Sequence, residues 1–180
     1  MFAGLFFVLP YVSLAHGAAP QVRIFSGQEE HRLSDGHGGY LVVTFNWTGS
    51  TNSSDDIYQS FYAEASIADY SGDGQELWVY WIEAYVEGDL TTNQVVSYYP
   101  YPPNWNIYVY VWNIEQGSTS YGVYGVNGYP SNAFSYSGNA HTYFYYPVLG
   151  WVEQGTIHCI VTYIVGSNPT GNCSYTSTGV

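Results

Sequence analysis

Apolar and polar residues alternate along most of the chain after residue 39, which is the pattern of β-strands that bury one face. In "YLVVTFNWT", one face carries Leu41, Val43, Phe45 and Trp47, and the opposite face carries Asn46. No segment has a convincing helical period. The pattern predicts strands over 40–48, 57–68, 76–87, 94–99, 106–115, 121–126, 142–146, 151–165 and 172–178. Short strands separated by Gly, Asn, Pro and Ser predict a single antiparallel β-sandwich, jelly-roll-like in form.

The first 39 residues do not share this alternation and divide into two parts. Residues 1–19 are apolar and end in small residues, which favours a secretory signal peptide, although no basic residue precedes Arg23. The alternative is a retained apolar donor segment. Residues 20–39 are polar and predict an extended N-terminal arm, with the sandwich over 40–180. A chain of 180 residues is the usual size for one such domain.

The charge balance excludes one large class of partners. Lys and Arg together number two, whereas Asp and Glu together number fourteen, and the formal net charge of the chain is −12. A nucleic-acid-binding surface needs clustered positive charge, so nucleic acid is not an expected partner. The apolar run near the N-terminus is also shorter than the roughly twenty residues of a membrane-spanning helix. We therefore expect no stable membrane span.

The two cysteines predict an oxidising compartment. Cys159 and Cys173 flank the turn-forming sequence "GSNPTG" at similar distances, which would place them opposite each other in a hairpin. A disulfide there would close a loop of 15 residues and contribute about 3 kcal/mol to stability in the loop-entropy model. Two buried thiols in a cytosolic protein are the alternative. A disulfide would favour an extracellular or cell-surface location.

Glycosylation sequons point to the same location. Asn46 lies in "NWT", Asn52 in "NSS" and Asn172 in "NCS". The alternation predicts that Asn46 faces outward from its strand, where a glycan would fit. These three asparagines are the predicted glycosylation sites.

One acidic turn resembles part of a calcium loop. In "DYSGDGQE", oxygen-bearing Asp69, Ser71 and Asp73 stand at alternate positions before Gly74. The glutamate that would complete such a loop is missing, because Tyr80 occupies the twelfth position. The two interpretations are a calcium site and an ordinary polar hairpin turn. No other cofactor is predicted.

An aromatic and acidic strip provides the alternative function. In "ELWVYWIEAYVEGD", Trp81, Glu83 and Tyr85 share the face opposite the predicted core face. Aromatic rings and carboxylates on one surface are typical of glycan-binding clefts, and paired acids cleave glycosidic bonds. The candidate catalytic pair is Glu83 with Glu64, and Glu115 and Glu153 are alternative partners for Glu83 on a neighbouring strand. Exposed aromatic residues with an occasional glutamate are, however, also ordinary on a sheet surface, so we expect no enzyme.

The lysine-free composition, rich in Tyr, Val and Gly, resembles surface proteins of thermophilic archaea, and among these the β-sandwich subunits of archaeal extracellular filaments and bundling pili. The resemblance spans the chain diffusely and includes no diagnostic motif. It implies a structural subunit of a filament or surface layer in a biofilm, assembled by donor-strand complementation with copies of itself. It places the donor strand at Val22, Arg23, Ile24 and Phe25 or, if the leading segment is retained, within 2–12. A secreted glycan-binding or glycan-cleaving domain is the alternative, with glycans as partners and Trp81 and Tyr85 as contacts.

Overall fold

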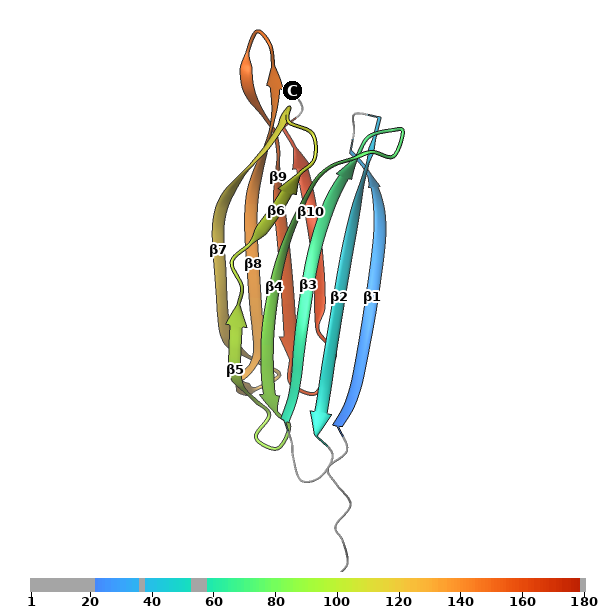
Figure 1. Cartoon of the computed structure of the whole chain (residues 1–180). Helices are drawn as coiled ribbons and strands as arrows, with labels where there is room; N and C mark the ends of the chain where they lie inside the picture. Colours follow the sequence, from blue (N-terminus) through green and yellow to red (C-terminus); the bar gives the residue numbers. More distant parts are fainter. Residues whose placement is uncertain (1–21, 36–37, 53–57, 179–180) are drawn as a thin grey trace, which may run out of the picture.

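A computed structural model describes residues 22–35, 38–52 and 58–178. These residues form ten β-strands in two antiparallel sheets, which pack face to face as elongated layers (Figure 1). The first sheet contains β1 (Val22–Ser34), β2 (Tyr40–Asn52), β3 (Tyr58–Tyr70), β4 (Glu76–Asp89), β5 (Gln94–Pro100) and β6 (Asn104–Ile107). The second contains β7 (Trp112–Val126), β8 (Tyr129–Tyr146), β9 (Gly150–Ile164) and β10 (Thr170–Ser177). The predicted antiparallel β-sandwich is confirmed.

Each sheet follows the order of the chain. The first sheet has the order β1-β2-β3-β4-β5, and β6 pairs with β4 beyond the end of β5. The second sheet has the order β10-β9-β8-β7. Both sheets are therefore meanders joined by one crossing from β6 to β7, a simpler path than the Greek keys of a jelly roll. Among the described residues, no helix is long and apolar enough to cross a membrane.

The core lies where the alternation predicts it. Leu41, Val43 and Phe45 of β2 are buried, and the apolar face of β4 from Trp78 to Val86 is at most 2% exposed at alternate positions. The facing layer adds Phe134, Tyr136, Ile157, Val161 and Tyr163 from β8 and β9. Burying aromatic and β-branched side chains between two pleated surfaces provides the main favourable free energy of such a fold.

The two long sides of the sandwich differ. On one side β5 contacts β8 of the opposite sheet, and the rings of Tyr98 and Phe134 lie 5.1 Å apart between their centroids. On the other side β10 packs over β2 and β3, so that β1 extends beyond the edge of the second sheet. The first side is thus closed by aromatic packing, whereas the second remains open.

Strand boundaries differ from the sequence prediction in three places. Residues 22–34, predicted as an arm, form β1. The predicted strand over 106–115 is divided by a turn between β6 and β7, and its second part joins the predicted strand over 121–126 in the single strand β7. The first part of β8, up to residue 141, was not predicted because its sequence "YPSNAFSYSGNA" is rich in turn-forming residues. Tertiary pairing along both edges of β8 overrides these local preferences.

Candidate functional site

The open side of the sandwich is formed by β1. All thirteen residues of β1 pair with β2, from Val22 opposite Asn52 to Ser34 opposite Tyr40. Its side chains are nevertheless exposed almost throughout, and of those described within the strand only Phe25 and Gly27 are partly buried. β1 is therefore attached mainly by its backbone ladder. This also explains why its sequence lacks the signal of a half-buried strand.

Phe25 anchors β1 to the core. Its ring centroid lies 5.4 Å from that of Phe61 and 5.9 Å from that of Trp47, both in edge-to-face geometry. Gly49 lies beneath this cluster, and a Cβ at that position would come within 2.6 Å of both phenylalanine rings. The absence of a side chain at Gly49 makes the space that Phe25 occupies.

The predicted donor residues all lie in β1. Val22, Arg23, Ile24 and Phe25 pair with Asn52, Thr51, Ser50 and Gly49 of the same chain. Within this structure they form an edge strand of their own sheet rather than a free arm. The alternative donor segment, 2–12, lies outside the described residues.

A groove runs between β1 and the edge of the second sheet. Its volume is about 440 Å³, and it is lined by Glu29, His31 and Leu33 of β1, by Val43 and Phe45 of β2, and by residues 171–175 of β10. The groove exists because Gly171 allows β10 to lie close to Phe45, over β2. One edge of β10 pairs with β9, and no described strand pairs with its other edge.

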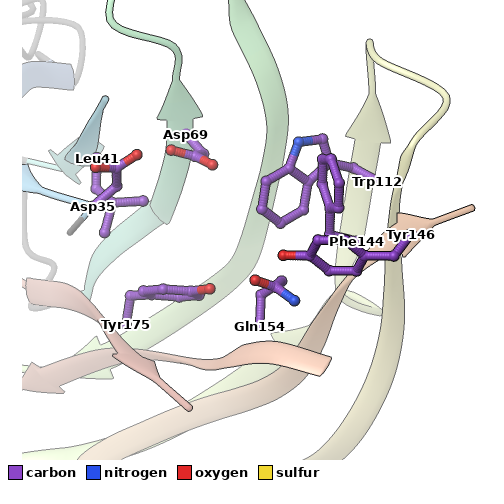
Figure 2. Close-up of a pocket in the computed structure, with 8 residues that line it drawn as sticks. All are labelled: Asp35, Leu41, Asp69, Trp112, Phe144, Tyr146, Gln154 and Tyr175. Atoms are coloured by element: carbon purple, nitrogen blue, oxygen red, sulfur yellow. The ribbon is translucent and has the colours of Figure 1, made fainter. Parts of the chain in front are cut away.

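A second hollow lies at the end of the sandwich where β1 ends and β2 begins. Figure 2 shows the side chains around it, which come from both sheets. The cavity of about 170 Å³ is lined by Asp35, Leu41, Asp69, Trp112, Phe144, Tyr146, Gln154 and Tyr175. It combines two carboxylates and an amide with four aromatic rings.

Asp69 is the buried acid of this end pocket. The residue is 4% exposed, and Asp69 Oδ1 has no hydrogen-bond partner among the described residues. Burial, and then the nearby charge of Asp35, raise the pKa of Asp69 to about 7. The Tyr70 backbone and the Trp78 indole lower the pKa of Asp69 and partly offset this rise. Trp78 Nε1 itself does not reach hydrogen-bonding geometry. The Asp35 carboxylate accepts hydrogen bonds from the backbone N–H of Gly39 at 3.0 and 3.1 Å.

The predicted calcium residues separate into two environments. Asp69 lines the end pocket, whereas Asp73 is fully exposed in the following turn. There the Ser71 hydroxyl hydrogen-bonds to Asp73 Oδ1 and accepts the Gln75 N–H at 3.0 Å. Within the described part of the chain, no group of three or more His, Cys, Asp or Glu side chains is arranged to hold a metal ion. The turn geometry matches the polar-hairpin interpretation.

The predicted aromatic and acidic strip lies on the outer face of the first sheet. Trp81 Nε1 donates to Glu83 Oε1 at 2.9 Å, and Tyr85 lies two residues further along the same half-buried face. Glu64 and Glu83 are directly opposite each other on β3 and β4. Burial raises the pKa of Glu64, and a hydrogen bond with Asn46 partly offsets this effect. The candidate acid pair is therefore brought together.

The disulfide prediction is confirmed. Cys159 and Cys173 are bonded and directly opposite each other on β9 and β10, with their Cα atoms 4.0 Å apart. Of the predicted glycosylation sites, Asn46 faces outward but is half-buried, and Asn172 is exposed on β10. The side chain of Asn52 lies outside the described set.

Sequence reasoning did not identify the end pocket. Its residues come from six strands and the β1–β2 connection, so no local motif unites them. Only Asp69 had been singled out, for a different role. No family model matches this chain, and no curated protein or solved structure is significantly similar to it.

Proposed function

We propose that this chain is a structural subunit of an extracellular homopolymer in which β1 of one copy pairs with β2 of the next. Such donor-strand complementation is a form of β-augmentation. The observation that carries the proposal is the way β1 is held. It forms a complete thirteen-residue ladder with β2. Yet among the described side chains of β1, Phe25 is the one large side chain that packs against the core.

Exchange of β1 between copies conserves these contacts. The pairing of β1 with β2 and the packing of Phe25 against Gly49 are the same whether the strand comes from its own chain or from a neighbour. Swapping an identical element in this way is a low-cost route to assembly. Because the connection between β1 and β2 is short, running from residue 35 to 39, the hinge favours exchange.

Exchange of this kind produces fibres when it does not close on itself. Each copy offers one β1 and accepts one β1 along its β2, so donor and acceptor surfaces differ. Heterologous contacts that do not close into a ring continue indefinitely. The buried disulfide of β9 and β10 is consistent with assembly outside the cytoplasm, because such bonds persist in oxidising compartments.

Electron microscopy of concentrated, purified protein tests the proposal. We expect fibres from the full chain and none from a variant lacking residues 22–34, which can accept a strand but cannot donate one. Added in small amounts to the full chain, that variant should cap the fibres and shorten them. The Ile24→Ala variant, altered at an exposed position, should form fibres normally. A monodisperse monomer at every concentration would refute the proposal.

A second candidate function is glycan binding or cleavage on the outer face of the first sheet, supported by the register of Glu64 with Glu83. Directly opposed residues have Cβ atoms about 5 Å apart, so two glutamate side chains there can bring their carboxyl groups to the about 5–5.5 Å that retaining glycosidases use. A glycan array tests it. Binding lost in Trp81→Ala, and hydrolysis lost in Glu83→Gln, would support this candidate. The absence of binding to every glycan class on the array would refute this candidate function.

A further inference from the structure

We propose that the turn between β8 and β9 is an anchor that inserts into the surface of a zwitterionic lipid bilayer. Pro147, Val148 and Leu149 form this turn, and we call it the apolar tip. The inference is independent of strand exchange. It rests on the exposure of the apolar tip, on the pair of aromatic rings behind it, and on the distribution of charge at this end of the sandwich.

The apolar tip is exposed, although its residue types are those of a protein interior. The side chains of Val148 and Leu149 are 93% and 71% exposed. Gly150, at a φ of +77°, closes the turn opposite Tyr146. Figure 1 shows the β8–β9 hairpin extending beyond the other strands, so the apolar tip is a convex end of the molecule. Its two aliphatic side chains therefore lie outside the sandwich.

Two other hairpin turns have the polar composition that the apolar tip lacks. The β7–β8 turn is Asn127-Gly128, and the β3–β4 turn contains Asp73-Gly74. Asn, Asp and Gly favour turns because they adopt the required backbone conformations, and Asn and Asp also hydrogen-bond to the local backbone. Val148 and Leu149 provide neither property, and their exposure to water is unfavourable. Contact with an apolar environment would remove this unfavourable exposure.

Two aromatic rings lie directly behind the apolar tip. Tyr145 and Trp151 are exposed and opposite each other on β8 and β9, with their ring centroids 5.4 Å apart in edge-to-face geometry. Trp and Tyr concentrate where the headgroups of a bilayer meet its hydrocarbon, because their rings are apolar and their N–H and O–H groups stay in contact with water. The order of aliphatic tip and then aromatic pair is thus the order of a bilayer from hydrocarbon to headgroup.

The connection between β6 and β7 adds exposed rings at the same end of the sandwich. The Tyr145 N–H donates to the carbonyl of Val111 at 2.8 Å, which holds this connection beside the hairpin (Figure 1). Tyr108 and Tyr110 of the connection are both exposed. A bilayer that received the apolar tip would therefore meet further tyrosine rings beside it. Such a short tip lies in the interfacial layer and does not span the membrane.

The distribution of charge selects the class of lipid. Residues 142–152, which include the apolar tip and both of its flanks, contain no Asp, Glu, Lys, Arg or His. The chain has no lysine and a formal net charge of −12, and Asp73 is fully exposed in the β3–β4 turn at this end. Anionic headgroups attract clusters of Lys and Arg, so they would repel this surface. Zwitterionic headgroups, which carry no net charge, do not.

Insertion of the apolar tip can be followed with a fluorophore whose emission shifts to the blue in an apolar environment. The label is attached through Val148→Cys and, as the matched control, through Asn127→Cys in the turn at the opposite end of β8. Phosphatidylcholine vesicles are titrated into each full chain. We expect a saturable blue shift of the label at position 148 and none at position 127. Vesicles that are half phosphatidylglycerol should bind the protein more weakly at low salt.

Cosedimentation with phosphatidylcholine vesicles compares unlabelled variants. Leu149→Ser should weaken partitioning at least about tenfold, because it removes the apolar side chain that enters the bilayer. The substitution lies at an exposed turn position, so the sandwich should fold normally. Leu90→Ser is the matched control, since Leu90 is also an exposed leucine in a turn, between β4 and β5. It should partition as the unaltered chain does.

Three vesicle results would overturn the inference: no partitioning onto phosphatidylcholine, equal partitioning of Leu149→Ser and the unaltered chain, and binding to the anionic vesicles alone. A blue shift at position 148 that grows with protein concentration in the absence of lipid would also overturn it, because a second copy would then cover the apolar tip. Fibres without vesicle binding would refute only the anchor. Vesicle binding without fibres would refute only the assembly proposal.

Discussion

Gly171 of β10 lies directly against the ring of Phe45 of β2, so closely that a Cβ at position 171 would overlap the ring. This contact sets the separation of the two sheets along the open side of the sandwich. It also positions β10 over β2 rather than over β1. The exposure of β1, and hence its suitability for exchange, follows from this packing.

Gly171→Ala is expected to destabilise the fold by about 1–3 kcal/mol, the usual cost of overpacking a well-packed core. The added methyl must displace either Phe45 or the backbone of β10. Urea unfolding followed by tryptophan fluorescence measures the change. Gly122→Ala on β7 is the matched control, since a Cβ there meets no atom within 4 Å. An equal effect of the two substitutions would contradict the role of the Gly171–Phe45 contact.

Phe25→Ala is expected to release β1 while leaving the rest of the sandwich folded. The substitution removes a partly buried ring from contact with Phe61 and Trp47, which we expect to cost about 1–2 kcal/mol, less than the 3–5 kcal/mol for a fully buried phenylalanine. Amide hydrogen exchange should accelerate in β1 and remain slow in β3 and β4. Ile24→Ala, at a side chain that is 75% exposed, should change neither. Uniformly faster exchange in Phe25→Ala would instead show that β1 is integral to the core.

The stability of the protein should depend on pH through Asp69. Its pKa of about 7 in the folded protein exceeds the ordinary value of 3.8, so the folded state binds a proton more tightly than the unfolded state. The contribution is therefore fully present below about pH 4, decreases as the pH rises towards 7, and is lost above it. Over roughly three pH units this amounts to about 4 kcal/mol at most.

Chemical denaturation of the unaltered chain, Asp69→Asn and Asp73→Asn across this pH range isolates the effect. Asp69→Asn should remove this fall in stability and should be the most stable of the three at pH 8, because it eliminates a buried charge beside Asp35. Asp73 is fully exposed, and its pKa is lowered by hydrogen bonds to Ser71 and Gln75. Asp73→Asn should therefore keep the Asp69-dependent fall. If the free energy of unfolding changed with pH in the same way in all three proteins, Asp69 would not be the source of the pH dependence.

Reduction of the Cys159–Cys173 disulfide is expected to lower the free energy of unfolding by about 2–4 kcal/mol, because the bond closes a loop of about 15 residues. The unreduced protein should contain no free thiol, since the two cysteines are the only ones in the chain. A thiol count checks the second expectation, and urea unfolding of the Cys159→Ser, Cys173→Ser variant checks the first. Unchanged stability in that variant would mean that the β9–β10 hairpin needs no covalent link.

Local pattern was sufficient to predict the interior of the sandwich. Strands such as β4 bury one face and leave the other half-buried, so apolar residues recur at every second position from Trp78 to Val86. The disulfide was predictable for a similar reason, because Cys159 and Cys173 flank the recognisable turn sequence "GSNPTG" and are opposite each other in the hairpin that it joins. Both predictions depend on residues close together in the sequence.

The edge strand and the end pocket could not be predicted in this way. The described side chains of β1 are exposed on both faces except at Phe25 and Gly27, so burial leaves no alternation in its sequence, and pairing with β2 makes it a strand. The end pocket unites Asp35, Asp69 and Trp112 from distant parts of the chain. Its existence depends on how the two sheets are stacked, which no local pattern encodes.

The central claim is that, in the assembled protein, the β1 strand paired with each β2 comes from a neighbouring copy. A disulfide cross-link between β1 and β2 tests this directly. Glu30 and Thr44 are directly opposite each other on β1 and β2. Cysteines at both positions should bond across this pair when concentrated protein is oxidised. Thr44→Cys with Ser66→Cys is the matched control, because these residues are opposite each other on β2 and β3 and remain within one chain.

Non-reducing electrophoresis of the Glu30→Cys, Thr44→Cys fibres should show a ladder of covalent multimers that collapses to a monomer on reduction. The control pair should run as a monomer throughout. Fibres whose Glu30→Cys, Thr44→Cys chains run entirely as internally cross-linked monomers would show that β1 stays with its own β2. That result would contradict strand exchange.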